Sequence, residues 1–325
     1  MAVWLAEKAL LPDGWANNVG ITVSEEGIIT ALEKNAAPNP QATRIKGVVV
    51  PGMPNLHSHA FQRAMAGLTE VAGNPSDSFW TWRDLMYRLV DKITPEQLET
   101  IASYLYIEML KAGYTSVAEF HYLHHSSSGA PYEERTELAL RIASAAKHTG
   151  IGLTLLPVLY SYAGFGAQPP SVGQRRFIND SDSYLTMYES LTSRLAGEPM
   201  QRTGLCFHSL RAVTPEQIGA ILACHPGQQP IHIHIAEQQK EVDDCLAWSG
   251  ERPVEWLYNH LPVDSRWCLI HATHPTPQET MKIATSGAVA GLCLTTEANL
   301  GDGIFPGPQY LEHNGVWGIG SDSHI

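Results

Sequence analysis

The stretch Val48-Val49-Val50-Pro51-Gly52-Met53-Pro54-Asn55-Leu56-His57-Ser58-His59 decides the fold. It places two histidines, one residue apart, shortly after a run of β-branched residues. Such a run is typical of a buried strand, and we predict that a strand at residues 48–50 opens the main domain. Imidazole nitrogens at a strand end can bind a metal ion. The stretch therefore predicts a sheet with a metal site at its edge.

Three later apolar runs also end in residues that bind or assist zinc. The run at 231–235 ends in His232-Ile233-His234-Ile235-Ala236-Glu237, another ends at His271, and the last ends at Ser321-Asp322. The carboxyl ends of parallel strands meet at one edge of a sheet, so four such ends indicate one shared site.

Strand-like runs alternate with helical patterns along most of the chain. Three helix starts are marked by Thr-Pro followed by Gln or Glu three residues after the threonine, which is the pattern of a capping box with proline at the first helical position. These starts are at Thr94, Thr214 and Thr276. The eight predicted strands are 48–50, 115–119, 152–157, 204–208, 231–235, 267–271, 288–294 and 316–320.

Eight strands alternating with helices favour a TIM-like (β/α)8 barrel over a doubly wound sheet. Residues 1–47 alternate short apolar stretches with turn residues and predict a small antiparallel β domain before a barrel of residues 48–325. The sequence ends three residues after Asp322. We therefore expect the barrel to lack its eighth helix and the return to the β domain, and this truncated chain to retain metal poorly.

Composition excludes several classes of partner. A formal net charge of −12 argues against nucleic acid and anionic membranes, because both are bound through basic patches. The five cysteines are scattered without a C-x-x-C pair, which fits free thiols in a reducing compartment. The N-terminal residues show no signal peptide or spanning segment, so a cytoplasmic location is expected, and a homodimer is compatible with it.

The motifs resemble those of the amidohydrolase superfamily. The features that carry the resemblance are His-x-His after the first strand, histidine after the fifth with Glu three residues on, histidine after the sixth, and Asp after the eighth. Within that superfamily the chain looks most like the deiminases that act on N-formimino-L-glutamate in histidine breakdown. The most specific segments are residues 54–63, 232–240 and 296–303.

Zinc chemistry assigns four of these residues as ligands. Zinc in a catalytic site takes a few nitrogen and oxygen ligands and keeps one position for water, whose pKa falls to about 7. We expect the ligands to be His57, His59, His234 and Asp322. Binuclear members of the superfamily use a modified lysine on strand four, whereas this strand ends Cys206-Phe207-His208. The resemblance thus implies one zinc per chain.

The remaining candidates divide into proton carriers and substrate contacts. Glu237 is expected to carry a proton to the departing nitrogen, His271 to polarise or deprotonate water, and Asp322 to accept a proton as well as bind zinc. Arg83 and Arg211 are predicted in loops after barrel strands, where arginine is suited to a substrate with two carboxylates. The resemblance adds Gln62, Tyr122 and His208 to the pocket.

Two alternatives remain open. A deaminase of guanine or a related purine would use the same metal residues, but a neutral ring does not require two arginines. A non-catalytic truncated barrel is the second alternative, and the intact ligand set with Glu237 counts against it. The leading hypothesis is a zinc hydrolase that converts N-formimino-L-glutamate to N-formyl-L-glutamate and ammonia.

Overall fold

The computed structural model describes residues 1–69 and 79–322, which fall into two compact units, Met1–Met53 and Pro54–Ile325. The first unit is a four-stranded sheet in the order β3-β2-β1-β4. Its strands are β1 (Ala2–Leu11), β2 (Gly14–Val23), β3 (Ile29–Glu33) and β4 (Thr43–Val49). The predicted antiparallel arrangement holds for β1, β2 and β3, whereas β4 pairs parallel to β1.

The prediction that residues 48–50 form the first barrel strand is wrong. Val48 and Val49 pair with Lys8 and Ala9 as the end of β4, and Val48 is 58% exposed. After Pro51-Gly52 the chain begins a new strand, β5 (Met53–Ser58), which carries His57 itself. A β-branched run fits either sheet equally well, so composition alone did not show to which one it belongs.

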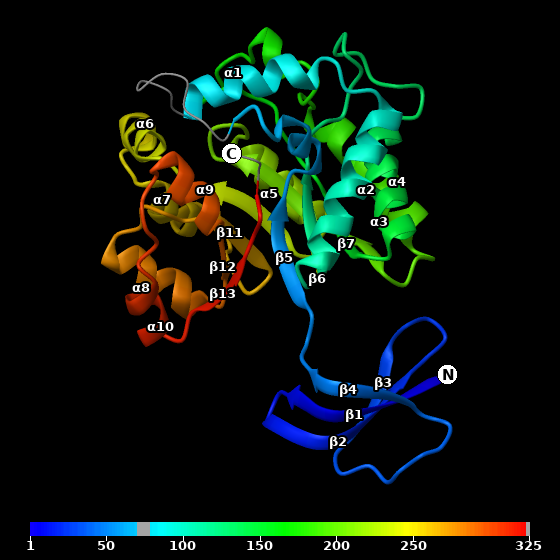
Figure 1. Ribbon diagram of the computed structural model, residues 1–325. Coiled ribbons are helices and arrows are strands. Elements are labelled where there is room, and N and C mark those ends of the chain that lie inside the picture. The colour runs from blue at the N-terminus through cyan, green and yellow to red at the C-terminus, as the bar shows by residue number, and fades with distance from the viewer. Residues whose placement is uncertain (70–78, 323–325) are drawn as a thin grey trace. The chain divides into compact units, whose positions relative to one another are not determined.

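The second unit contains two parallel sheets that together follow the expected barrel order (Figure 1). One sheet has the order β5-β6-β7-β8 and the other β13-β12-β11-β10-β9. The strands are β5, β6 (Tyr114–His121), β7 (Gly152–Pro157), β8 (Gln201–Thr203), β9 (Leu205–Ser209), β10 (Ile231–Ile235), β11 (Trp267–His271), β12 (Val289–Leu292) and β13 (Val316–Ile319). The other seven predicted strands coincide with these within a few residues.

The two sheets meet at two places rather than through continuous ladders. Two short strands flank Gly204: β8 pairs with β7, and β9, which is the predicted fourth strand, pairs with β10. A Cβ at Gly204 would lie 2.6 Å from Leu156 Cδ2, which explains why the smallest residue stands at this close approach. At the other junction a single bridge joins Ser58 to Asp322.

Helices cover the outer sides of both sheets (Figure 1). The α-helices are α1 (Phe79–Val90), α2 (Pro95–Lys111), α3 (Glu137–Thr149), α4 (Ser181–Leu195), α5 (Pro215–Cys224), α6 (Gln239–Ser249), α7 (Pro253–His260), α8 (Pro277–Ser286), α9 (Leu294–Leu300) and α10 (Gly307–Glu312). The short 3-10 helices are η1 (Ala60–Met65) and η2 (Val172–Gln174). The three predicted capping boxes are confirmed at Thr94, Thr214 and Thr276. Within the described ranges, no helix is both long and apolar enough to cross a membrane.

Candidate metal centre and active site

The ends of the first and eighth barrel strands are tied together by backbone and side-chain hydrogen bonds. Asp322 N donates to His57 O at 2.9 Å, and Ser321 N donates to Asn55 Oδ1 at 3.0 Å. The Asn55 amide in turn donates to Ser321 Oγ at 2.8 Å. A Cβ at Gly320 would lie 2.7 Å from His57 Cβ, so only glycine lets the two strands approach this closely. This contact brings Asp322 beside the histidine pair.

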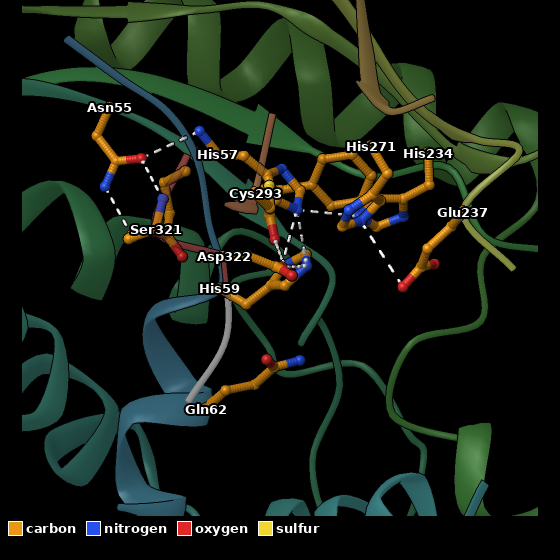
Figure 2. A network of polar contacts seen from close by, with 12 residues as sticks. Asn55, His57, His59, Gln62, His234, Glu237, His271, Cys293, Ser321 and Asp322 are labelled. Atoms are coloured by element: carbon orange, nitrogen blue, oxygen red, sulfur yellow. Dashed lines mark hydrogen bonds and ion pairs between the residues drawn. The ribbon is translucent and has the colours of Figure 1, made fainter. Parts of the chain in front are cut away.

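Three imidazoles and one carboxylate converge at this point (Figure 2). His57 Nε2 lies 3.1 Å from His59 Nε2 and 3.0 Å from His234 Nε2. Asp322 Oδ1 is 3.2 Å from His57 Nε2 and 3.4 Å from His59 Nε2. Ligands about 2.0–2.1 Å from a tetrahedral zinc lie roughly 3.3 Å from one another. These four distances are close to that value and are compatible with a zinc ion bound among the four side chains.

Burial keeps the three imidazoles in the neutral form that binds metals. It lowers the pKa of His57 to about 3, lowers that of His59, and holds that of His234 well below its usual range. His59 Nδ1 lies 2.9 Å from Phe120 O, so the ring donates there and its Nε2 lone pair faces the cluster. Burial raises the pKa of Asp322, but the hydrogen bond from His57, together with the neighbouring histidines, outweighs it and keeps that carboxyl ionised.

His271 lies between two buried carboxylates next to this cluster. Its Nδ1 is 3.1 Å from Glu297 Oε1, and its Nε2 is 3.8 Å from Glu237 Oε1. Burial lowers the pKa of His271, but the charge of Glu237 and the side-chain hydrogen bonds with Cys293 and Glu297 raise it well above the usual value. Glu297 fixes the ring orientation, so that Nε2 points to the cluster and to Glu237.

A second group of ligand-type atoms overlaps the first. The ligand-type atoms of His57, His271 and Cys293 lie within 4.8 Å of one another. Burial raises the pKa of the Cys293 thiol to about 12, whereas a cysteine binds metal as the thiolate. The group made of His57, His59 and His234, with Asp322, is therefore the better metal site.

Four residues at the site have left-handed backbone conformations although none is glycine. These are Ala236 with φ 48°, His271 with φ 69°, Ala272 with φ 47° and Asp322 with φ 54°. Each such conformation costs of order 1–3 kcal/mol and persists only where the surroundings enforce it. All four lie at the ends of β10, β11 and β13, where the chain must turn sharply to present site side chains.

A cavity of about 60 Å³ opens beside the metal candidates. Its wall contains all five predicted substrate residues: Gln62, Arg83, Tyr122, His208 and Arg211. The volume is below the roughly 300–1,000 Å³ typical of ligand pockets.

Most of these contacts come from the expected strand ends. Gln62 lies on η1 and donates to Tyr122 Oη at 2.7 Å, and His208 lies on β9. Arg211 follows β9, as predicted, but Arg83 lies on α1 and not in a loop. The reason is that the segment after β5 forms an additional helix before α2, so its arginine is presented from a helical turn.

A larger cavity of about 620 Å³ lies at the opposite ends of the strands. Its wall includes Ser116, Gly152, His232 and Trp267. His232 is buried in the barrel interior, as its sequence parity with His234 predicts. Among the described residues, neither group of clustered ligand-type atoms lies at this larger cavity. The smaller cavity is accordingly the candidate active site.

Sequence reasoning missed three buried carboxylates that support the site. Glu297 orients His271, and Glu241 accepts hydrogen bonds from the backbone beside Glu237. Glu119 accepts from Ala60 N at 2.6 Å and from Tyr106 Oη at 3.1 Å, which fixes the backbone that follows His59. A carboxylate at the end of an apolar strand, as at Glu119, was the available signal for one of them.

The stability of the chain should depend on pH through Glu119. Burial raises the pKa of this carboxyl from 4.5 to about 7, so the folded protein keeps a proton that the unfolded chain has lost. The free energy of unfolding should thus fall by about 3 kcal/mol as the pH rises from the unfolded-state pKa of 4.5 past the folded-state pKa of about 7, and then level off.

Glu119→Gln removes that proton equilibrium while preserving size. We expect the difference in unfolding free energy between parent and variant to change with pH between 5 and 7.5, measured by urea unfolding of zinc-free protein. Identical pH slopes for the two proteins would contradict the assignment.

The chain belongs to the amidohydrolase family, whose signature matches residues 48–325. It is thereby a hydrolase of the class that acts on C–N bonds. Residues 1–45 match the N-terminal domain of formimidoylglutamate deiminase HutF.

Individual relatives agree with this membership. The chain is 62% identical to a formimidoylglutamate deiminase of Pseudomonas aeruginosa, covering all of this chain and 71% of that protein. An amidohydrolase structure from Brucella melitensis superposes with a TM-score of 0.94 at 51% identity over 99% of this chain and 71% of that one. An adenosine deaminase from Xanthomonas campestris, solved with bound zinc, shares the fold with a TM-score of 0.77 at 19% identity, over 99% and 69% of the chains.

Proposed function

We propose that the chain catalyses the zinc-dependent hydrolytic deimination of N-formimino-L-glutamate to N-formyl-L-glutamate and ammonia. The observation that carries the proposal is the convergence of His57, His59, His234 and Asp322 at zinc-ligand spacing, beside a cavity lined by two arginines. The 62% identical deiminase adds support for the substrate.

One zinc per chain is the proposed cofactor. The four ligand atoms would hold it, because three neutral imidazoles and one ionised carboxylate are a donor set that zinc prefers. A bound zinc would supply Lewis acidity and a hydrolytic nucleophile at neutral pH. The strand-four segment that carries His208 offers no lysine, which favours a single ion.

The buried acids and His271 divide water activation and proton transfer. Water adds to the amidine carbon and forms the new C–O bond, while Asp322 is placed to accept a proton from it and the cationic His271 to polarise it. Glu237 is placed to relay protons to the nitrogen whose C–N bond breaks: the =NH group gains both protons of the water and leaves as ammonia. The amidine carbon keeps the oxygen of the water and becomes the formyl group of N-formyl-L-glutamate.

The arginines are proposed to hold the substrate by its two carboxylates. Burial lowers the pKa of Arg211, but the charges of Glu241 and Glu237 raise it above the usual value, so its cation is retained inside the protein. The Arg83 guanidinium lies 5.6 Å from the Tyr87 ring centroid at the same cavity. A planar guanidinium pairs with a carboxylate through two hydrogen bonds, which suits a dicarboxylate better than a purine.

A substrate panel tests the proposal. Zinc-loaded chain should release ammonia from N-formimino-L-glutamate with kcat/KM at least about 10³-fold above that for guanine or for a formamidine without carboxylates, because such substrates offer no carboxylate to the two arginines. Ammonia release is measured with the coupled glutamate dehydrogenase assay. Preference for guanine would establish the purine alternative, and no turnover of any amidine or purine by zinc-loaded protein would refute the proposed activity.

A further inference from the structure

Glu241 is a buried carboxylate that no sequence motif singled out. It lies in the first turn of α6 and is 3% exposed. Its Oε1 accepts from Ala236 N at 3.1 Å and its Oε2 from Glu237 N at 3.3 Å. Both oxygens therefore bind the turn that joins His234 to Glu237.

The turn that Glu241 holds has little conformational freedom of its own. Ala236 has φ 48°, a left-handed conformation that a residue with a side chain rarely adopts. Ala236 O accepts from His274 N at 3.1 Å, and Ile235 O accepts from Ala272 N at 3.0 Å. The carbonyls of Ile235 and Ala236 are thus fixed by amides that follow β11. The amides of Ala236 and Glu237 are fixed by the single carboxylate of Glu241.

Glu237, whose amide Glu241 binds, lies in the cavity wall together with Arg211. The Glu237 carboxylate also lies 3.8 Å from His271 Nε2. A shift of the turn would therefore move the proposed proton carrier relative to the rest of the site.

We propose that Glu241 is a positioning residue that holds the turn between His234 and Glu237 and so sets the placement of Glu237 for proton transfer. This inference rests on the proposed function. Glu241 does not line the cavity, so its effect is transmitted through Glu237, which does.

The chain provides a matched control in Glu279. This carboxylate also lies in the first turn of a helix, α8, and is 5% exposed. It accepts from Thr276 N at 2.6 Å and Glu255 N at 3.1 Å and pairs with Arg252 at 3.0 Å. Like Glu241 it is buried and accepts from two backbone amides, but neither of its amides belongs to a residue of the cavity wall, whereas Glu241 accepts from the amide of Glu237.

The test compares Glu241→Gln with Glu279→Gln by zinc content, steady-state kinetics and calorimetric binding of glutarate, which has two carboxylates and no amidine. For Glu241→Gln we expect parent-like zinc content, a kcat lower by roughly 10–100-fold because Glu237 is displaced, and glutarate binding within about 3-fold of the parent because the arginines are untouched. Glu279→Gln should melt at a lower temperature yet keep kcat and glutarate affinity within about 2-fold.

Glu241→Asp keeps the charge but is one methylene shorter, and it carries the test if the glutamine variant does not fold. Its kcat should fall while glutarate affinity stays within about 3-fold of the parent value. The inference is overturned if Glu241→Gln changes only the melting temperature, as Glu279→Gln does, or if it loses zinc in proportion to activity. A parent protein that does not deiminate N-formimino-L-glutamate would instead refute the proposed function.

Discussion

Replacing His234 with alanine is expected to remove the metal and the activity together. His234 Nε2 lies 3.0 Å from His57 Nε2, and without it two imidazoles and one carboxylate remain around the site. A three-ligand remainder loses both affinity and tetrahedral geometry. We expect zinc per chain, measured by atomic emission after dialysis, to fall to a small fraction, and kcat/KM to fall by roughly 10³-fold or more.

His232→Ala is the matched control for that experiment. His232 lies two residues earlier on β10, shares the inward side-chain direction and is also buried. Its removal costs core packing but leaves the four ligand atoms in place, so zinc content should stay at the parent level. Full zinc retention in the His234 variant, or equal metal loss in both, would contradict the ligand assignment.

The order of barrel strands could be predicted from the sequence because the strands are short apolar runs between well-marked helix starts. Capping boxes at Thr94, Thr214 and Thr276 are local features, and local chemistry is what a single sequence reports reliably. The assignment of Val48–Val50 failed because the same β-branched run suits the edge of the N-terminal sheet. Only pairing with β1, more than 35 residues away, decides between the two.

The site, like the fold, could be predicted from the sequence only in part. The proposed metal ligands lie at strand ends, where their residue types and order made them candidates, whereas Gln62, Tyr122 and His208 became candidates only through the family resemblance. The supporting carboxylates depend on contacts between distant segments: Glu119 holds Ala60, 59 residues away, and Glu297 holds His271, 26 residues away. No sequence spacing predicts either contact, because the residues are brought together only by the fold. Arg83 was predicted as a pocket residue but on the wrong element, since the additional helix α1 has no fixed place in the βα alternation.

The second large effect is expected from Glu237→Gln, which should retain zinc and lose turnover. The Glu237 carboxylate lies 3.8 Å from His271 Nε2, outside the cluster of four ligand atoms, so the amide leaves the metal ligands intact. It cannot accept and return a proton, and removal of a proton carrier typically costs 10²–10⁴-fold. We expect kcat to fall by roughly 10²-fold or more with little change in KM, because ground-state recognition rests on the arginines.

Asp243→Asn provides the control for charge removal near the same strand end. Asp243 is exposed on α6 and accepts from Gln239 Nε2 at 2.9 Å, so its variant changes net charge without entering the cavity. Steady-state kinetics with zinc analysis on both variants separates the two effects. If Glu237→Gln keeps near-native kcat at full zinc occupancy, the proton must reach the departing nitrogen by another route. His271 would then be the remaining buried group beside the cluster, and the raised pKa that Glu237 gives its imidazole would be the main contribution of that carboxylate.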